Sequence, residues 1–411
     1  MKHLRLAAFL PALVLAGCGL LDDQTMRLVT DRPEIAAYVE RYNARQNDAR
    51  VEILYDADPA RAVLGGRAAG DVVIAQWLAS PALMAKFDSL ADIVKPGKID
   101  PAWFYPGLLA MGSRDNRAFL VPVSFSLPAV VFSRASVAAE LPSLALPFET
   151  MRTMSGAFNV MGKNGWSAVG FSPLWSGDFL SNLARVSGVR FRAARNGQPS
   201  WDADALARTA AFIRSWVGEV NGGEQADGVF SERTLVQPSA RLLSTKKILF
   251  ALVPFADYIS LPEEKRRDFD FRWLASGPSI AVQDDVLFAG VLRSSRNKTG
   301  AREFLTWFCS PQTQRSLLEV NQSRRIGVFC ISGGFSSFKA INEKDLPQRY
   351  PLLLGRIPPE SSLVFPETLP DDWLRMRDEV IRPWLGRSAA EPEQQPLDKA
   401  LGEWRKAQEN R

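Results

Sequence analysis

The chain has 411 residues and 46% hydrophobic content, which is enough for two or three domains with real cores. Its formal net charge of +5 is small for this length and comes without a long Lys/Arg run, so composition argues against a nucleic-acid partner. The only histidine, His3, lies in an N-terminal segment that we expect to be removed, which excludes Ser-His and Cys-His catalysis and histidine-ligated metal sites. We expect no metal and no cofactor.

Residues 1–17 are typical of an export signal, with a positively charged start and a short apolar stretch, Leu6–Leu15. That stretch is too short to span a bilayer as a permanent helix. Leu15-Ala16-Gly17-Cys18 is similar to the lipobox of bacterial lipoproteins, in which the cysteine thiol is lipidated; a plain secretory cleavage site is the alternative. We therefore expect a lipid on Cys18 and a short tether over residues 18–25.

A regular alternation of strand and helix patterns follows the tether. The expected strands are Met26–Thr30, Val51–Tyr55 and Asp71–Ala75. Between the first two, Asp31 stands three residues before Glu34, which is a helix-start signature. Strand, helix, strand at this spacing favours an α/β layer with parallel pairing.

The segment Phe119–Ser133 consists of two short apolar runs that are interrupted by Pro122 and Pro128. Proline is excluded from the middle of a central strand because it removes a ladder donor. The pattern predicts two strand segments with a bent crossing, where the chain leaves one folded body and enters another. An ordinary edge strand with a turn is the alternative.

The rest of the chain alternates between irregular segments and periodic ones. The expected elements are a helix over Asp202–Val217, a polar loop over Asn221–Gly228, a buried strand over Ile248–Val253, an extended segment over Val286–Leu292, a helix over Gly300–Phe308, and helices from Asp371 onward. Cys309 and Cys330 remain after Cys18 is set aside, and they form either a disulfide or two free thiols.

Several segments carry a family resemblance that covers nearly all of the chain after the export signal. They are Arg27–Asn43, Asp71–Trp77, Val121-Pro122 with Val130–Arg134, Leu242–Ile259, Asn297–Leu305 with Ser310–Gln314, and Leu385–Trp404. In this order, and with the lipobox, they resemble the bacterial extracellular solute-binding proteins of ABC importers, in the carbohydrate-uptake cluster that includes maltose-binding protein. One departure is Phe132-Ser133-Arg134, where the family has Tyr-Asn-Lys.

The resemblance implies an α/β fold of two discontinuous lobes that close on a ligand about a hinge of three crossings, as in type II periplasmic binding proteins. It places residues 26–126 and 284–327 in lobe one and residues 127–283 and 328–411 in lobe two. The second and third crossings are then expected near Gln283 and Gly327.

The same resemblance implies a function. We expect a monomeric, lipid-anchored protein of the cell envelope, facing the periplasm or the cell exterior. We expect it to capture a small polar solute, with a sugar or an oligosaccharide as the expected class, and to deliver it to ABC permease and ATPase subunits. We expect no enzymatic activity.

The candidate ligand contacts begin at the ends of the first strands. Ligands of open α/β sheets sit beyond the carboxyl ends of strands, where Asp31 and Arg32 follow the first strand and Trp77 follows the third. An indole face can stack on the C–H surface of a sugar, while carboxylates and arginine bond to hydroxyl groups. A helix cap is the alternative for Asp31, and core packing is the alternative for Trp77.

Eight further candidates complete the expected cleft, and core packing is the alternative for the aromatic ones. They are Ser124 and Phe125 at the crossing, Trp175 and Asp178 in a turn-rich loop, Phe255, Asp257 and Tyr258 after the buried strand, and Trp373 before the last helices. Aromatic faces together with neutral or acidic hydrogen-bonding groups favour carbohydrate over a phosphate or a metal.

Two other functions stay open at this point. The pairs Asp284-Asp285 and Asp371-Asp372 could support glycoside hydrolysis, which needs no histidine, but neither pair belongs to a recognisable motif. An adhesin or a structural lipoprotein that reuses the fold without transport is the other alternative, since a fold does not fix a function.

Overall fold

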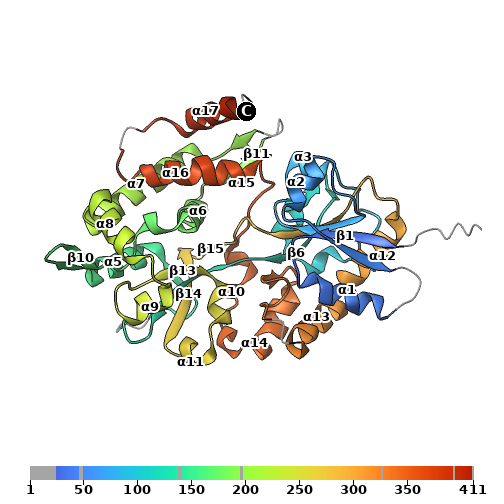
Figure 1. The fold of residues 1–411 in the computed structure, drawn as a ribbon, viewed down its shortest axis with the longest axis horizontal. Coiled ribbons are helices and arrows are strands. Elements are labelled where there is room, and N and C mark those ends of the chain that lie inside the picture. Colours follow the sequence, from blue (N-terminus) through green and yellow to red (C-terminus); the bar gives the residue numbers. More distant parts are fainter. Residues whose placement is uncertain are drawn as a thin grey trace, which may run out of the picture.

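The computed structural model describes residues 25–45, 50–137, 141–194, 198–324, 327–391 and 394–409. The expected export signal, Cys18 and nearly all of the expected tether lie outside these residues. Within the described ranges, no helix is long and apolar enough to cross a membrane. The chain forms two α/β lobes that lie side by side along the long axis of the molecule (Figure 1).

The first lobe is built on a six-stranded mixed sheet. Its strands, in spatial order, are β17 (Phe335–Ser336), β6 (Val121–Phe125), β16 (Leu287–Val291), β3 (Val72–Ala75), β1 (Met26–Thr30) and β2 (Val51–Tyr55). β1 pairs in parallel with β2 and β3, as the strand-helix alternation predicted. The expected bounds of β1 and β2 are confirmed to the residue, because each apolar run is closed by polar residues on both sides.

Helices cover this sheet on both sides. They are α1 (Ile35–Asn43), α2 (Pro59–Leu64), α3 (Pro81–Met84), α4 (Pro106–Met111), α12 (Lys298–Phe308) and α13 (Pro311–Ser323). α1 buries an apolar stripe that includes Tyr42, whose ring meets Phe304 of α12 at 5.1 Å between centroids. The expected helix over Gly300–Phe308 is confirmed as α12, which begins two residues earlier because the Asn297 side chain accepts from the Gly300 N–H at 3.0 Å.

The second lobe is built on another six-stranded sheet. Its strands are β13 (Ala251–Pro254), β7 (Pro128–Ser133), β14 (Phe269–Ser276), β15 (Ser279–Ala281) and β18 (Leu363–Val364) in spatial order, with β8 (Ala145–Pro147) also paired to β14. The expected strand over Ile248–Val253 is shifted toward its C-terminal end. Its first part bonds elsewhere: the Leu249 N–H donates to the Gly170 carbonyl at 3.0 Å.

The helices of the second lobe come from two parts of the chain. They are α5 (Phe148–Phe158), α6 (Gly177–Val186), α7 (Ala203–Ser215), α8 (Glu224–Thr234), α9 (Ser239–Ser244), α10 (Phe255–Ser260), α11 (Glu263–Arg266), α15 (Trp373–Met376), α16 (Arg382–Arg387) and α17 (Leu397–Glu409). The expected loop over Asn221–Gly228 is wrong, because α8 begins inside it. Asn221 is buried and donates to the Phe171 carbonyl and to Asp227, which fixes the turn before that helix.

Smaller elements complete the fold. They are the two-stranded pairs β4 (Ser113–Arg114) with β5 (Arg117–Ala118), β9 (Val160–Gly162) with β10 (Gly165–Ala168) and β11 (Arg192–Ala193) with β12 (Pro199–Ser200), and α14 (Leu346–Arg349) between β17 and β18.

The proline-containing segment is confirmed as a crossing. β6 belongs to the first sheet and β7 to the second, with Ser126 and Leu127 between them. Pro122 lies inside β6 where the register against β16 shifts, which accommodates the missing N–H donor. Pro128 is the first residue of β7 and lies opposite Pro254 at the end of the ladder.

Two further crossings join the lobes. The second runs from β15 to β16 and lies beside the first, since the Gln283 N–H donates to the Ser126 carbonyl at 3.0 Å. The third was expected near Gly327, but β17 still pairs with β6 in the first sheet, so the chain returns to the second sheet only between residues 336 and 363. The ladder pairing of Phe335 with Phe125 fixes β17 in the first sheet, while the Phe335 ring packs on Phe125 at 5.8 Å and also on Phe255 and Trp273 of the second lobe.

The two cysteines of the described chain do not form a disulfide. Cys309 and Cys330 are both buried free thiols, and burial raises the pKa of each to about 12. The alternative of a disulfide between them is therefore wrong for this structure.

Candidate functional site

Three of the expected contact residues follow the ends of neighbouring parallel strands. Asp31 and Arg32 come directly after β1, with the Arg32 Nε 3.4 Å from an Asp31 carboxylate oxygen, and Trp77 comes two residues after β3. α1 begins at Ile35 and the residue at its cap position is Glu34, so the interpretation of Asp31 as a helix cap is wrong. The carboxyl edge of the first sheet thus presents an acidic, a basic and an aromatic side chain.

Trp77 has a strained backbone and a charged neighbour from the other lobe. Its φ of 65° lies in the left-handed region, which is costly for a residue with a large side chain. The guanidinium carbon of Arg377 lies 4.8 Å from the centroid of the Trp77 ring, in cation–π contact. Arg377 belongs to the segment after α15, so this contact ties the second lobe to the first.

A buried carboxylate anchors Arg377 from its other side. Asp284 accepts from Arg377 Nη1 at 2.8 Å and from the Trp373 indole N–H at 2.6 Å, and Arg185 Nη2 lies 3.7 Å away. Burial by itself would raise the pKa of Asp284, but the two guanidinium groups outweigh that effect and hold this pKa below its ordinary value. Trp77, Asp284, Asp285, Trp373 and Arg377 are called the interlobe cluster below.

Asp285 behaves differently from its neighbour. It accepts only from Gln76 Nε2 at 3.4 Å among the described residues, and its other carboxylate oxygen is buried without a hydrogen-bond partner there. Burial, and then the charge of Asp284, raise the pKa of Asp285 to about 6. The interlobe cluster therefore contains one carboxylate that stays ionised and one that is readily protonated.

Asp178 joins this cluster through a chain of ion pairs. Its carboxylate accepts from Arg382, which also donates to Asp378 at 2.8 Å. Asp378 in turn accepts from Arg377 Nε at 2.8 Å. Ser176 caps α6 by accepting from the Phe179 N–H, which places Asp178 in the first turn of that helix.

Two expected residues at the crossing are instead buried. Ser124 is 3% exposed within β6, and Phe125 is 2% exposed. The Phe125 ring packs against Tyr105 at 5.4 Å and against Phe365 at 6.3 Å. Contrary to expectation, these side chains fill the space where β6 meets the second lobe.

The expected aromatic contacts of the second lobe are also part of the core. Phe255 packs on Trp273 and Phe329, and the Tyr258 ring lies beside Phe271 at 5.3 Å. Asp257, on the same helix, is exposed. The expectation that this helix offers an aromatic face to a solute therefore fails here, because α10 turns its rings inward onto β14.

Trp175 lies away from the interlobe cluster. Its ring stacks on Phe230 of α8 at 5.7 Å and meets Phe171 edge to face. It is partly buried, so it packs the second lobe rather than facing the first. Asp227 lies in the same region, and burial raises the pKa of its carboxyl to about 6.

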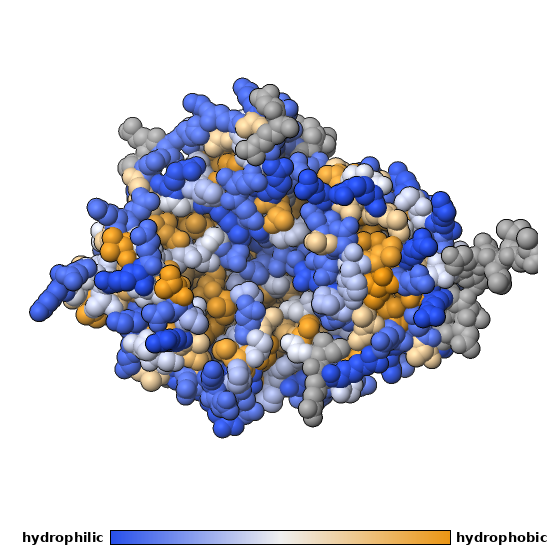
Figure 2. Space-filling view, viewed as in Figure 1, coloured by the Kyte–Doolittle hydropathy of each residue, from blue (hydrophilic) through white to orange (hydrophobic). Residues whose placement is uncertain are grey.

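A cavity of about 580 Å³ lies at the seam between the lobes, and we call it the seam cavity. Its first-lobe wall comes from α2 and α3, and its second-lobe wall comes from the segment around Asp371, from α15 and from α17. Two of the expected tryptophans, Trp77 and Trp373, line it. Figure 2 shows hydrophilic side chains over the middle of the molecule, where the two lobes meet.

Two hydrogen bonds, one to a side chain and one between backbone groups, close the seam next to this cavity. Asp371 accepts from the Ala82 N–H at the start of α3 at 2.9 Å, and the Leu369 N–H donates to the Ala79 carbonyl at 3.0 Å. Both bonds run from one lobe to the other, so the seam cavity is bounded by contacts that must break when the lobes separate.

Sequence reasoning missed several charged and polar side chains that line the seam cavity or belong to or pair with the interlobe cluster. The missed residues are Asp58, Arg61, Gln408, Arg185, Arg377 and Arg382. Only Arg377 left a usable signal, since it follows Trp373 by four residues and so lies on the same helix face. Among the described residues, no group of three acidic, histidine or cysteine side chains is arranged to hold a metal ion.

Comparison with known proteins gives a match in structure and none in sequence. No protein-family model matches the chain, and no curated protein matches its sequence. The sugar-binding protein MalE of Xanthomonas citri is similar in structure, with a TM-score of 0.66 and 14% identity, over 92% of this chain and 95% of that one. The maltose-binding periplasmic protein MalE of Listeria monocytogenes, solved with maltose, is similar with a TM-score of 0.65 and 12% identity, over 93% of this chain and 97% of that one.

A third solved structure widens the range of sugars. The cyclic alpha-maltosyl-1,6-maltose binding protein of Arthrobacter globiformis has a TM-score of 0.64 and 13% identity, over 92% of this chain and 96% of that one. At such low identity the likeness concerns the fold alone. It confirms the predicted architecture of two α/β lobes and, at that level, the resemblance to solute-binding proteins.

Proposed function

We propose that this protein binds a carbohydrate in the seam cavity, between its two lobes, and delivers it to an ABC importer. The observation that supports this most strongly is the position of the seam cavity, which places two indoles and several hydrogen-bonding side chains between lobes of a sugar-binding fold. Its volume of about 580 Å³ lies in the usual range for small-molecule sites.

The chemistry of the cavity wall suits a sugar. The partly exposed Trp77 ring offers apolar surface for the C–H groups of a pyranose, and Trp373, only 5% exposed, closes the wall beside it. The carboxylates of Asp58 and Asp371 accept from hydroxyl groups. Arg61 donates to hydroxyl or ring oxygens. A sugar held between Trp77 and the segment around Asp371 would contact both lobes, and its binding energy would then favour the closed arrangement.

The envelope location belongs to the same proposal. The lipobox-like Leu15-Ala16-Gly17-Cys18 supports a lipid on Cys18, and the short chain between Cys18 and β1 supports a body held near the membrane. The partners are then a permease and an ATPase in that membrane, with the protein acting as a monomer. Loss of sugar uptake on deletion of the gene would support transport, whereas unchanged uptake would favour the adhesin alternative.

A thermal-shift screen tests the binding site. Maltose, maltotriose and mannotriose are the first probes, since structures with this fold bind such sugars. We expect at least one to raise the Tm of the wild-type protein, and Trp77→Ala to abolish that shift. Trp307→Ala is the matched control, because Trp307 is also a partly buried first-lobe tryptophan beneath an arginine but lies outside the seam cavity. Equal loss in both variants would argue against the seam cavity.

Glycoside hydrolysis stays as a second candidate because of one observation. Glycosidases use a general acid of raised pKa next to a second carboxylate that stays ionised, and Asp285 and Asp284 show this difference in pKa. Against this, Arg377 and Trp373 already occupy the two oxygens of Asp284. New reducing ends that disappear in Asp285→Asn would establish hydrolysis, and an intact sugar recovered after binding would support the binding function.

A further inference from the structure

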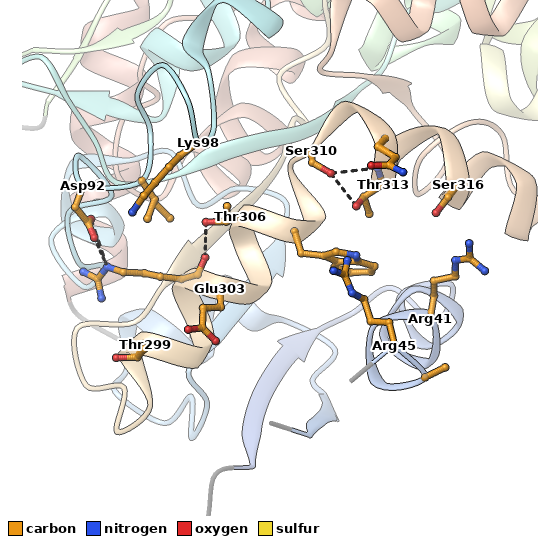
Figure 3. A pocket seen from close by; sticks show the side chains of 15 residues that line it. Arg41, Arg45, Asp92, Lys98, Thr299, Glu303, Thr306, Ser310, Thr313 and Ser316 are labelled. Carbon is orange, nitrogen blue, oxygen red and sulfur yellow. Dashed lines mark hydrogen bonds and ion pairs between the residues drawn. The ribbon is translucent and has the colours of Figure 1, made fainter. Parts of the chain in front are cut away.

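A second cavity, about twice the volume of the seam cavity, lies away from the seam. It is an open groove of about 1160 Å³ on the first lobe, and we call it the basic groove. Its walls come from the last turn of α1, from α12, from the start of α13 and from the segment around Lys98 (Figure 3). The proposed sugar function uses none of its residues.

Among the described residues of the basic groove, positive side chains without an ion-paired carboxylate outnumber the negative ones. Arg41 lies in the last turn of α1, Arg45 follows two residues after that helix ends, and Lys98 stands on the opposite wall. All three are exposed, and none has an ion-paired carboxylate among the residues that the structure describes. Of the two acidic residues in the groove, Asp92 is already paired with Arg302 at 3.2 Å, which leaves Glu303 against three cations.

An aromatic side chain lies between these cations. Trp307 is partly exposed, and the guanidinium of Arg45 lies 5.9 Å from its ring centroid. Its ring is held from behind by Tyr42, at 4.9 Å, so it stays at the floor of the groove. Tryptophan with neighbouring arginine or lysine is the combination that favours the polar boundary of a lipid bilayer.

The basic groove lies at the same end of the molecule as the start of the folded chain. The Met26 N–H donates to the Arg50 carbonyl at 2.8 Å, and the Asn43 amide bonds to the backbone of Val51 at 2.9 Å. The last turn of α1 and the first residue of β1 are therefore joined through the start of β2, and α12 lies at this end too (Figure 1). Cys18 precedes Thr25 by seven residues, which reach at most about 25 Å when fully extended.

We propose that the basic groove is the surface with which the protein rests on an anionic phospholipid bilayer, with Arg41, Arg45 and Lys98 on headgroup phosphates and Trp307 at the boundary. This inference rests on the lipid anchor of the proposed function. The anchor supplies the attachment, and the groove sets the orientation. Three basic side chains at the surface favour this orientation by about a hundredfold. The second lobe then points away from the bilayer and can rotate about the hinge relative to the first lobe.

Hydrogen exchange on vesicles tests the orientation. The lipidated protein is reconstituted on phosphatidylcholine vesicles with or without roughly 30% phosphatidylglycerol, and amide exchange is followed along the chain. We expect exchange at residues 41–45 and 303–307 to slow at least about threefold on the anionic vesicles only, and to recover in high salt. A further sample contains inorganic phosphate and no vesicles. The proposal would be overturned by equal protection on both vesicles, by the same protection with phosphate alone, or by no protection on either vesicle.

Matched variants separate this inference from the sugar function. Arg41→Glu/Arg45→Glu should abolish the protection and keep the sugar-induced Tm shift, whereas Trp77→Ala should do the opposite. Arg208→Glu/Lys246→Glu changes the same charge at exposed sites of the second lobe and should change neither. Mass spectrometry of Cys18 tests the anchor separately. If no lipid is found, co-sedimentation of the unlipidated protein decides: binding to anionic vesicles alone supports the groove, and no binding overturns it.

Discussion

Two tryptophans of the first lobe each lie beneath an arginine, and the two pairs have opposite surroundings. Arg377 over Trp77 has a side chain only 9% exposed, which is bonded to Asp284 at 2.8 Å. Arg45 over Trp307 is exposed, and no carboxylate among the described residues is ion-paired with it. The same arginine–tryptophan pair thus joins the two lobes in one place and presents an exposed positive charge to solvent in the other.

The difference predicts where mutations act. Breaking a buried ion pair is costly, because the remaining charge is neither paired nor solvated. An exposed pair contributes little to the free energy of unfolding. Changes in the interlobe cluster should therefore alter stability and lobe closure. Changes in the basic groove should alter only what the surface attracts.

The largest effect is expected from Asp284→Ala. It leaves Arg185 buried without its carboxylate and leaves Arg377 with Asp378 as its remaining ion-paired carboxylate among the described residues, and we expect the free energy of unfolding to fall by about 3–5 kcal/mol in urea denaturation. The control is Asp92→Ala, which breaks the partly exposed pair with Arg302 at the basic groove and should cost less than about 1 kcal/mol. Similar losses in the two variants would remove the contrast between the regions.

A pH effect of intermediate size is expected from Asp285. Its pKa of about 6 in the folded protein lies above the usual value of about 3.9, so the folded state binds more protons than the unfolded state between these pH values. Stability from this group is thus present in acid and is lost as the pH rises through 6. Asp285 keeps part of its surface exposed, so the loss stays below about 3 kcal/mol.

Asp285→Asn should remove this loss. We expect the variant to be more stable than the wild type in urea at pH 7.5 and about equally stable at pH 4. Asp227, whose pKa is also raised to about 6, keeps its own pH dependence and serves as the internal reference. An unchanged pH profile in the Asn variant would mean that Asp285 is not the titrating group.

A smaller effect is expected at the seam itself. Asp371→Ala removes the acceptor of the Ala82 N–H at the start of α3 and should weaken the closed arrangement by about 1 kcal/mol. Small-angle X-ray scattering should show a larger radius of gyration without unfolding. Asp100→Ala removes a similar bond to the Ala102 N–H within the first lobe and should leave the radius unchanged.

The smallest effect on stability is expected at the basic groove. Arg41→Glu/Arg45→Glu changes exposed side chains that have no ion-paired partner among the described residues, so the free energy of unfolding should stay within about 0.5 kcal/mol of the wild type. Thermal and urea unfolding check this. A larger loss would show that these arginines hold α1 in place, and would weaken the contrast between the interlobe cluster and the basic groove.

Local patterns predicted those parts of the fold that short segments determine. Pro122 and Pro128 marked the first crossing because a proline is tolerated only where the ladder is interrupted or ends. β1 and β2 were predicted to the residue for a similar reason, since polar residues close both runs. The third crossing was missed because β17 is a two-residue strand whose place depends on Phe125, more than two hundred residues earlier.

The candidate site was predicted only in part, for a physical reason. Periodicity tells that Phe255 or Trp373 is buried on one face but not what buries it. The Trp373 indole N–H donates to Asp284, and the Phe255 ring packs on Trp273. Asp284 lies far from Trp373 in the sequence, so periodicity could not reveal this partner. The position of Trp77 at the edge of the first sheet could be predicted because it follows a strand end directly, but its contact with a ligand stays a prediction.

Calorimetric titration of the sugar from the thermal-shift screen tests the central claim most directly. If the seam cavity is the binding site, the wild type and Trp307→Ala bind with the same Kd, and Trp77→Ala binds at least about tenfold more weakly because it loses a stacking face of roughly 1.4 kcal/mol. If Trp77→Ala binds like the wild type, or if Trp307→Ala loses the sugar instead, the site does not lie between the lobes.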